Sequence, residues 1–427
     1  MLATLRQRNF ALLWFGGLIS FAGDWALIIA LPVFVYDLTG STLATGAMFI
    51  AQTLPRLLFG PLAGVLVDRW DRKRTLVVVN LAQAVVLPLL LLVQSADMLW
   101  LLYLVACVQT SVSLFVHPAE RALVPRLVGE ERLLPANSLL AFSWELTRLV
   151  APPLGGLLMG LLGLTSIVLF DSISFLLAAI LLALIAMPPA AQQDRPVDRG
   201  PAGIAAIWEE LVAGLRYARY DRLVSALFVI VGTSMISEGI ANVLGFPWLK
   251  ETLHGGALER GWLASAQAVG GVIGGLAIGR VAQRIQPVAL MTASGVLLGV
   301  ASMALININL FPVPPALVMP LALVLKAAQG APIICFYVSL ETLLQQSAPD
   351  RYRGRIFGAY GAVCALAMLA GQAIASFLGD QLGVVVVMNG VGALFLAAGL
   401  LALALLRGLG IAHFVSPSSV AVTADPA

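Results

Sequence analysis

Twelve long apolar stretches, separated by turn signals, decide what this chain can fold into. Each has at least about 18 residues, the length that an α-helix needs to cross a bilayer. Because 60% of the residues are hydrophobic and only 11% are charged, the solvent must be lipid. The sequence therefore predicts an all-α membrane protein with twelve spanning helices. Their predicted limits are 10–36, 43–67, 75–95, 99–121, 137–162, 165–188, 221–249, 258–282, 288–310, 316–346, 356–378 and 384–407.

Basic residues gather in alternate loops, and this asymmetry predicts the orientation. Cytoplasmic loops of membrane proteins are enriched in Lys and Arg. The loops that we place inside carry Arg69, Arg72, Lys73, Arg74, Arg126, Arg132, Arg280, Arg284, Arg351, Arg353 and Arg355. The loops placed outside carry Asp37, Asp97, Asp380 and a mixed group within 250–260. Both termini are then expected in the cytoplasm, with the first apolar stretch kept as a membrane helix.

A polar break divides the apolar stretches into two sets of six. Residues 189–220 start as a Pro- and Gly-rich linker and continue with Ile204, Ile207, Trp208, Leu211 and Leu215 on one helical face. We expect a helix on the cytoplasmic membrane surface; the alternative is a helix that extends the next span into water. The predicted domains are a six-helix bundle over 1–188, this linker, a second bundle over 221–407 and a disordered cytoplasmic tail over 408–427.

The two halves share short patterns. Gly60, Gly64 and Arg69 match Gly271, Gly275 and Arg280 at a constant offset of 211. The first and seventh stretches each place one acid, Asp24 or Glu238, eight or nine residues before a proline. Repeated halves around a central cavity are the architecture of an alternating-access transporter. We therefore expect two pseudo-symmetric bundles.

The loop after the second stretch reads GVLVDRWDRKRT. It resembles the loop between the second and third helices of the major facilitator superfamily, with Asp71 in place of a glycine. The resemblance implies that Gly64, Asp68, Arg69 and Arg72 form a gating motif, in which Asp68 ties the second helix to the eleventh. The plain alternative is a positive-inside loop. Gly60 and Gly64, four residues apart, predict close packing of this helix on a neighbour.

A second motif, APPLGG, lies in the fifth stretch just after Arg148. It resembles the Gly-Pro-x-x-Gly-Gly motif of proton-driven exporters in the same superfamily, and it contributes Pro152, Gly155 and Gly156 to a bendable seam. The segments FAGDWALIIALPVFVYDLTGS, HPAERALVPRLVGEERLLPANSL and APDRYRGRIFG resemble a bacterial subgroup that includes macrolide-efflux and enterobactin-exporter-like proteins. The resemblance covers essentially the whole chain, although the usual Arg of the fourth helix is absent.

Charges inside the spans are costly and are therefore candidate functional groups. Asp24 and Arg56 both come near the bilayer centre, counting about 1.5 Å per residue. They are expected to pair, either as a fixed brace or as a proton-sensitive contact in which Asp24 takes up the proton. Glu238 has no evident partner and is the second proton-coupling candidate. His117 is expected to be a packed residue rather than a relay.

Other residues are weaker candidates for the substrate cavity. Glu145 and Arg148 are expected to satisfy one another, three residues apart on one helix. The candidate cavity residues are Trp25, Phe34, Glu145, Asp171, Phe246 and Lys326. By family analogy, helices 1, 2, 4, 5, 7, 8, 10 and 11 line the cavity. Few fixed charges suit an amphipathic, apolar molecule better than a sugar.

Several function classes are excluded by missing patterns. The sequence has no Walker A loop, no HExxH pattern and no basic face for nucleic acid, and its three cysteines lie in apolar runs. We expect no metal, no cofactor and no enzymatic activity. The sequence therefore predicts a monomeric exporter in the bacterial cytoplasmic membrane that exchanges amphipathic small molecules for protons. The alternatives on the same scaffold are an exporter of a specific metabolite such as a siderophore, or a lysolipid flippase.

Overall fold

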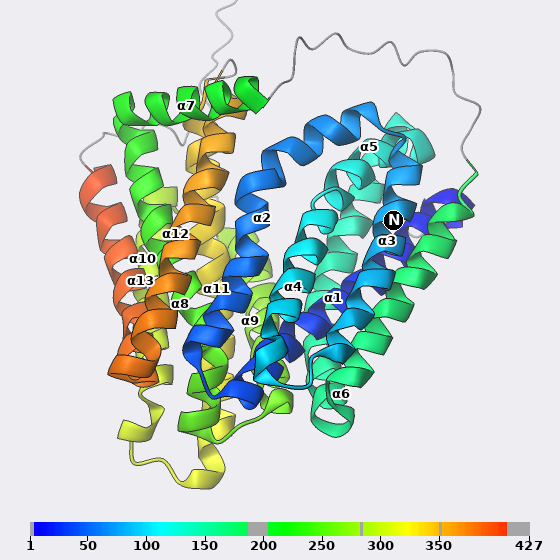
Figure 1. The fold of residues 1–427 in the computed structure, drawn as a ribbon. Helices are drawn as coiled ribbons and strands as arrows, with labels where there is room; N and C mark the ends of the chain where they lie inside the picture. Colours follow the sequence, from blue (N-terminus) through cyan, green and yellow to red (C-terminus); the bar gives the residue numbers. More distant parts are fainter. Residues whose placement is uncertain (1–3, 187–203, 282–284, 350–351, 408–427) are drawn as a thin grey trace, which may run out of the picture.

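Helices make up nearly all of the described chain, and no strand occurs among the described residues (Figure 1). The computed structural model describes all residues except 1–3, 187–203, 282–284, 350–351 and 408–427. The described residues also include a few helical positions whose side chains are not described. The predicted tail, the first part of the linker, Arg284, Arg351 and the side chains of Asp68, Ile204, Ile207 and Arg280 therefore lie outside the described residues.

The N-terminal half runs as far as α6. Its elements are η1 (Thr4–Arg6), α1 (Arg8–Thr39), α2 (Thr42–Arg69), α3 (Arg72–Val86), η2 (Leu87–Leu92), η3 (Ala96–Met98), α4 (Leu99–Ser113), α5 (Val116–Val128), η4 (Glu130–Arg132) and α6 (Leu133–Ala183). The C-terminal half begins with α7 (Ile204–Tyr220) and continues with α8 (Arg222–Leu253), α9 (Ala257–Val281), α10 (Pro287–Ile306), η6 (Ile308–Leu310), α11 (Pro315–Ser347), α12 (Arg353–Leu382) and α13 (Val384–Arg407).

Nine helical segments of the described chain are long and apolar enough to cross a membrane. One of them contains α6, which has 51 residues and turns sharply at Gly163, where φ is 71° and ψ is −173°. A glycine is suited to this left-handed backbone because it has no Cβ. Two predicted spans are therefore joined at Gly163 without a loop. The helices α2 and α9, with 28 and 25 residues, are not among the nine, so the count of twelve stays a prediction.

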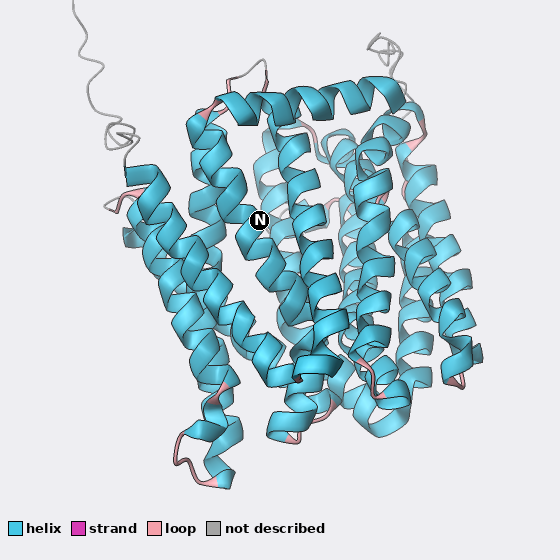
Figure 2. Cartoon of the chain, turned by 60° about the vertical axis from the view of Figure 1, so that its left-hand side comes forward, coloured by secondary structure: helices cyan, strands magenta, loops and turns pink. Residues whose placement is uncertain are grey.

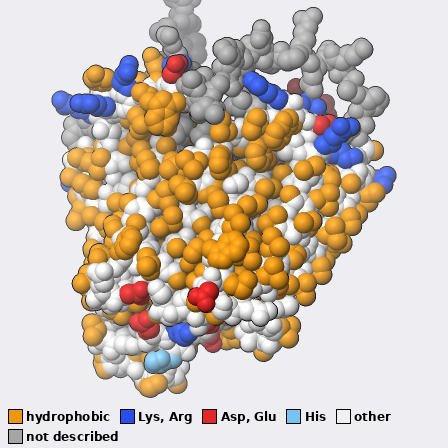
Figure 3. All heavy atoms as spheres, viewed as in Figure 1, with side chains coloured by type: hydrophobic (Ala, Val, Ile, Leu, Met, Phe, Trp, Pro, Cys, Tyr) orange, Lys and Arg blue, Asp and Glu red, His pale blue; other side chains and the backbone are white. Residues whose placement is uncertain are grey.

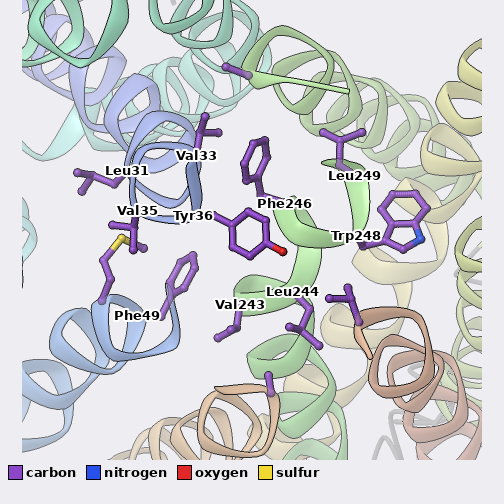
Figure 4. Close-up of a cluster of buried hydrophobic side chains, with 14 of the residues drawn as sticks. Leu31, Val33, Val35, Tyr36, Phe49, Val243, Leu244, Phe246, Trp248 and Leu249 are labelled. Carbon is purple, nitrogen blue, oxygen red and sulfur yellow. The ribbon is translucent and has the colours of Figure 1, made fainter. Parts of the chain in front are cut away.

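The hydrophobic core is shared between the halves at only one end of the molecule. There, buried side chains of α1 and α2, such as Tyr36 and Phe49, join those of α8, such as Phe246 and Trp248, in one cluster (Figure 4). At the other end each half has a cluster of its own. One is centred on Phe10, Trp14 and Leu123, and the other on Leu227, Phe336 and Ile356.

The end with separate clusters also holds α7, which lies across the other helices (Figures 1 and 2). We call it the α7 end. On the face seen in Figure 3, Lys and Arg side chains gather mostly there, and a broad apolar band covers the middle. This end therefore corresponds to the predicted cytoplasmic side, by the enrichment of cytoplasmic loops in Lys and Arg.

The glycines of α2 correct one expectation. Among the described atoms, a Cβ added at Gly60 or Gly64 would meet nothing within 4 Å, so neither position packs closely on a described part of a neighbouring helix. Gly354 and Gly358 of α12 are equally open, whereas Gly46 and Gly379, at the opposite end, leave no room for a Cβ. The helices α2 and α12 thus touch at one end and leave their glycine faces uncovered at the α7 end.

Candidate functional site

A cavity of about 480 Å³ opens inside the N-terminal half. Its wall is built from α1, α2, α3, η2, α4, α5 and α6, and no described residue of the C-terminal half lines it. This differs from the expected cavity between the halves. The helix α2 packs on α12 as well as on α4, so it forms the side of the cavity that faces the C-terminal half. The volume is in the range of about 300–1,000 Å³ that is usual for small-molecule sites.

Asp24 of α1 and Arg56 of α2, which were predicted to pair near the bilayer centre, both line this cavity. They interact electrostatically, but no ion pair within 4 Å joins these two described residues. His117 also interacts electrostatically with Asp24. The carboxylate and the guanidinium therefore face one cavity without neutralising each other in direct contact, and each is available to a molecule inside it.

Aromatic rings form the wall beside Asp24. Trp144 of α6 lies edge-on to both Trp25 and Phe21 of α1, with ring centroids 6.0 and 5.2 Å apart. His117 lies 5.9 Å from Phe21 in a stacked arrangement and 5.7 Å from Trp144. The indole N–H of Trp25 is buried and finds no hydrogen-bond partner among the described residues. A buried donor left unpaired is costly, so Trp25 is a candidate hydrogen-bond donor to a ligand.

Polar residues of α3 and α4 complete the wall, and they are not among the site residues predicted from the sequence. The amide of Gln109 donates to the Gln83 carbonyl at 3.3 Å, and its own oxygen is buried without a partner. Gln109, Ser113 and His117 follow one another at intervals of four residues, which is the spacing of one helical face. This regular polar stripe was the signal available in the sequence. The remaining polar lining residues are Ser20, Gln52, Asn80 and Thr110.

Five of the six predicted cavity residues lie elsewhere: Phe34, Asp171 and Phe246, and the charged Glu145 and Lys326. Asp171 of α6 is 0% exposed, accepts a hydrogen bond from Ser174 at 3.2 Å and packs against Gly23 of α1. Phe246 is 1% exposed and belongs to the core shared by both halves, and Phe34 packs against the same core. Asp171 was expected in the cavity as a charge inside a span, and Phe34 and Phe246 as aromatic side chains suited to an apolar substrate. The position of a residue along a span does not specify whether its side chain faces the cavity or packs against a neighbouring helix.

The charged candidates of the C-terminal half form a separate group. Glu238 of α8 interacts electrostatically with Lys326 of α11 and with Arg148 of α6, so it does have partners at its depth. Lys326 also donates a hydrogen bond to Gln329 at 3.3 Å. Arg148 is 3.9 Å from Glu145, three residues away on α6, as expected from the spacing. None of these residues lines the N-terminal cavity.

The proline pair of the fifth predicted span makes a contact between the halves. Pro153 has no N–H, so it cannot bond the carbonyl of Leu149 four residues before it. Ser265 of α9 donates its hydroxyl to that carbonyl at 2.6 Å. A Cβ on Gly155 would come within 2.6 Å of the Ala26 backbone in α1. The seam is therefore a tight three-helix joint of α1, α6 and α9.

Residues of the motif after α2 form hydrogen bonds with the backbone at the ends of α3 and α6. Asp71 is the N-cap of α3 and accepts a hydrogen bond from the Arg74 N–H at 2.7 Å. Lys73 donates to the Ile185 carbonyl, just beyond the end of α6, at 2.7 Å. Arg69 is exposed in the last turn of α2, and Arg72 opens α3. The expected tie of Asp68 to the eleventh span lies outside the described side chains.

Polar contacts between the halves lie at the end opposite α7. Asp37 forms an ion pair with Lys250, and the neighbouring Tyr36 donates a hydrogen bond to Glu251. Asp380 of α12 accepts hydrogen bonds from the Thr42 N–H at 3.0 Å and the Ser41 hydroxyl at 3.1 Å. Deeper in the same interface, Gln372 donates to Thr53 at 2.9 Å. Together with the shared core, these contacts close this end of the molecule.

The family comparison agrees with this architecture. The model of the family described as transmembrane secretion effector matches residues 1–411. The chain belongs to this family of major facilitator transporters. It is 26% identical over 380 residues to macrolide efflux protein A of Streptococcus pyogenes, covering 88% of this chain and 90% of that protein.

Two further relatives are exporters by name. The chain is 27% identical to the multidrug efflux pump Tap of Mycolicibacterium fortuitum, over 87% of this chain and 89% of the pump. It is also 27% identical to the enterobactin exporter EntS of Escherichia coli O1:K1, over 85% of this chain and 83% of the exporter. The resemblance drawn from the loop motifs is thus confirmed. The chain is a multi-pass membrane transporter rather than an enzyme.

Solved structures share the fold. A bacterial homologue of the iron transporter ferroportin in its inward-facing state has a TM-score of 0.71 at 18% identity, covering 93% of this chain and 98% of that chain. A bacterial homologue of ferroportin in its outward-facing state has a TM-score of 0.56 at 17% identity, covering 93% of this chain and 99% of that chain. The chain therefore shares its helical arrangement with these solved transporters.

Proposed function

We propose that this protein exports an amphipathic small molecule from the cytoplasm in exchange for protons, by alternating access. The observation that carries the proposal is the N-terminal cavity of about 480 Å³, which brings an acid, Asp24, beside aromatic rings and a polar stripe. Aromatic walls with a few fixed polar groups suit a molecule that is apolar over most of its surface. The names of the macrolide and multidrug relatives support the same substrate class.

The arrangement of the halves supports an inward-facing state. The end opposite α7 is closed by one shared core and by polar contacts, whereas the α7 end has separate cores and uncovered glycines. If the basic α7 end faces the cytoplasm, the substrate enters from that side. Alternating access then needs the opposite contacts to break and the glycine faces of α2 and α12 to close on each other.

Proton coupling is assigned to Asp24. A cavity acid that binds either a proton or the substrate makes the two binding events compete, which is what exchange in opposite directions requires. Glu238 interacts with Lys326 and Arg148 outside this cavity, and we assign it to the contact between the halves.

The test is efflux from proteoliposomes under an imposed pH gradient. A radiolabelled macrolide and a lipophilic cationic dye serve as probes, and wild type is compared with Asp24→Asn and Glu238→Gln. Asp97→Asn, an exposed acid at the opposite end, is the matched control. We expect loss of gradient-driven efflux in Asp24→Asn alone, with probe binding that no longer depends on pH. Wild-type transport that ignores the pH gradient would refute the exchange mechanism.

A second candidate cargo is a siderophore-type metabolite. The observation that favours it is the similarity to the enterobactin exporter over most of both chains. Arg56 and the buried N–H of Trp25 offer donors to an oxygen-rich molecule in the same cavity. Binding of a catecholate, with no binding of the macrolide, would favour this cargo over the drug.

A further inference from the structure

The break between α4 and α5 places one histidine at the cavity wall. Pro118 has no N–H and so cannot bond the carbonyl of Leu114, four residues before it. The helix is interrupted there, with α4 ending at Ser113 and α5 starting at Val116. His117 consequently lies in the first turn of α5 and lines the cavity, with 55% of its side chain exposed.

A buried acid lies behind this histidine. Nδ1 of His117 is 3.8 Å from Oε2 of Glu120, whose side chain is only 10% exposed. Glu120 points toward α1, where Gly17 leaves space for it: a Cβ at Gly17 would be 3.7 Å from Oε1. A buried carboxylate is costly unless it has a partner. The imidazole is the ionisable group closest to it among the described contacts.

On its other side the histidine faces the large cavity, which Asp24 also lines. Phe21, three residues before Asp24 on α1, stacks on the His117 ring with centroids 5.9 Å apart, and the imidazole and the Asp24 carboxyl interact electrostatically. The charged or titratable groups around His117 are Asp24 on α1, Arg56 on α2 and Glu120 on α5. Asp171 on α6 lies behind them and interacts electrostatically with Asp24. An imidazole between two carboxyl groups can accept a proton on one nitrogen and release one from the other.

Beyond Glu120 lies a second, small cavity of about 20 Å³. A volume of roughly 10–15 Å³ is enough for one water molecule. Ser20, Phe21 and Asn80 line both cavities, whereas Leu13 and Leu76 of the small one belong to the N-terminal core cluster at the α7 end. Glu120 therefore leads from the substrate cavity toward the predicted cytoplasmic side.

We propose that Asp24, His117 and Glu120 form a proton-transfer array between the substrate cavity and the α7 end, an inference that rests on the proposed exchange of substrate for protons. Protonated Asp24 gives its proton to Nε2 of His117, and Nδ1 of the ring passes its own proton to the Glu120 carboxylate. Asp24 is left ionised, Glu120 is left neutral and the ring has changed tautomer. Glu120 then releases the proton toward the small cavity, and the ring returns to its first tautomer through exchange with water in the large one.

The test separates proton-coupled transport from the movement of substrate itself. Proteoliposomes with a macrolide probe are assayed for efflux driven by a pH gradient and for counterflow, in which labelled and unlabelled macrolide exchange without a gradient. His117→Phe keeps a ring against Phe21 and Trp144 but carries no proton. Glu120→Gln keeps the shape of the second acid. His254→Gln, at the opposite end, is the control.

Both array variants should lose gradient-driven efflux by at least about a hundredfold, the scale of one lost acid–base step, while counterflow in Glu120→Gln, whose side chain lies behind the substrate cavity, stays within about twofold of wild type as expected for intact binding. The double variant should be no worse than either single one, because both residues act in one path. Gradient-driven efflux that survives in His117→Phe or Glu120→Gln would overturn the array and leave the exporter function standing. Wild-type efflux that ignores the gradient would overturn both proposals.

Discussion

Asp380 ties the two halves together by adding a second cap, beyond the N-cap residue Ser41, to a helix that belongs to the other half. Its carboxylate accepts hydrogen bonds from the Thr42 N–H at 3.0 Å and from the Ser41 hydroxyl at 3.1 Å, at the start of α2. An N-cap contributes about 1 kcal/mol. Because this cap exists only while the end opposite α7 is closed, Asp380→Ala should lower the ratio of closed to open molecules about fivefold, from that free energy.

The population shift is measurable by pulsed electron–electron resonance between spin labels on the two halves. Leu161 of α6 and Leu310 of η6 are 72% and 82% exposed and tolerate labels at the end opposite α7. The native cysteines, Cys107, Cys335 and Cys364, are replaced first. We expect Asp380→Ala to add a longer-distance population between the labels.

Asp71 provides the matched control, because it caps α3 within its own half. Asp71→Ala loses a cap of similar strength, about 1 kcal/mol, but the cap is the same whether the opposite end is open or closed. It should lower thermal stability without changing the distances. Equal distance distributions for Asp380→Ala and wild type would refute the idea that this cap favours the closed state.

Three further changes test other contacts. Ser265→Ala removes the hydrogen bond to the Leu149 carbonyl that Pro153 leaves free and should lower the free energy of unfolding by about 1–3 kcal/mol, seen as a lower melting temperature in detergent. The control is Ser138→Ala, which loses only a hydrogen bond within its own helix. Equal melting temperatures of the two variants would argue against the joint. Gly155→Leu should abolish folding and transport because α1 touches that position, whereas Gly160→Leu, with nothing within 4 Å of an added Cβ, should be tolerated; equal expression of both would contradict the contact. Trp25→Phe keeps an aromatic ring but removes the indole donor, so macrolide binding measured by equilibrium dialysis should weaken about tenfold for one lost hydrogen bond; unchanged affinity would show that the donor does not contact this drug.

The sequence predicted the membrane fold well because the relevant forces are local and strong. Each apolar stretch must satisfy its backbone hydrogen bonds within a helix in lipid, and the loop motif around Asp68 is specific to one superfamily. The joint at Gly163 fell between the limits predicted for two spans, since a glycine at a tight turn between apolar stretches marks the boundary. The uncovered faces of Gly60 and Gly64 were not predicted, because helix packing depends on which conformational state is occupied.

The site was predicted only in part. Of the named candidates, Asp24, Arg56 and Trp25 line the cavity, since a polar or aromatic group near the middle of a span often faces inward. Asp171 and Phe246 are instead buried between helices, because the same depth serves packing as well as binding. The partner of His117 could have been found from its spacing to Glu120, three residues on, which places both on one helical face.

The turn at Gly163 also has a consequence for biogenesis. The two parts of α6 meet at that residue without a polar loop, so no charged segment between them can direct the second part across the bilayer. The signal for its orientation must come from charges outside the pair, such as Arg132 and the basic residues before it. We expect the pair to leave the translocon as one helical hairpin, whose second part enters lipid only together with the first.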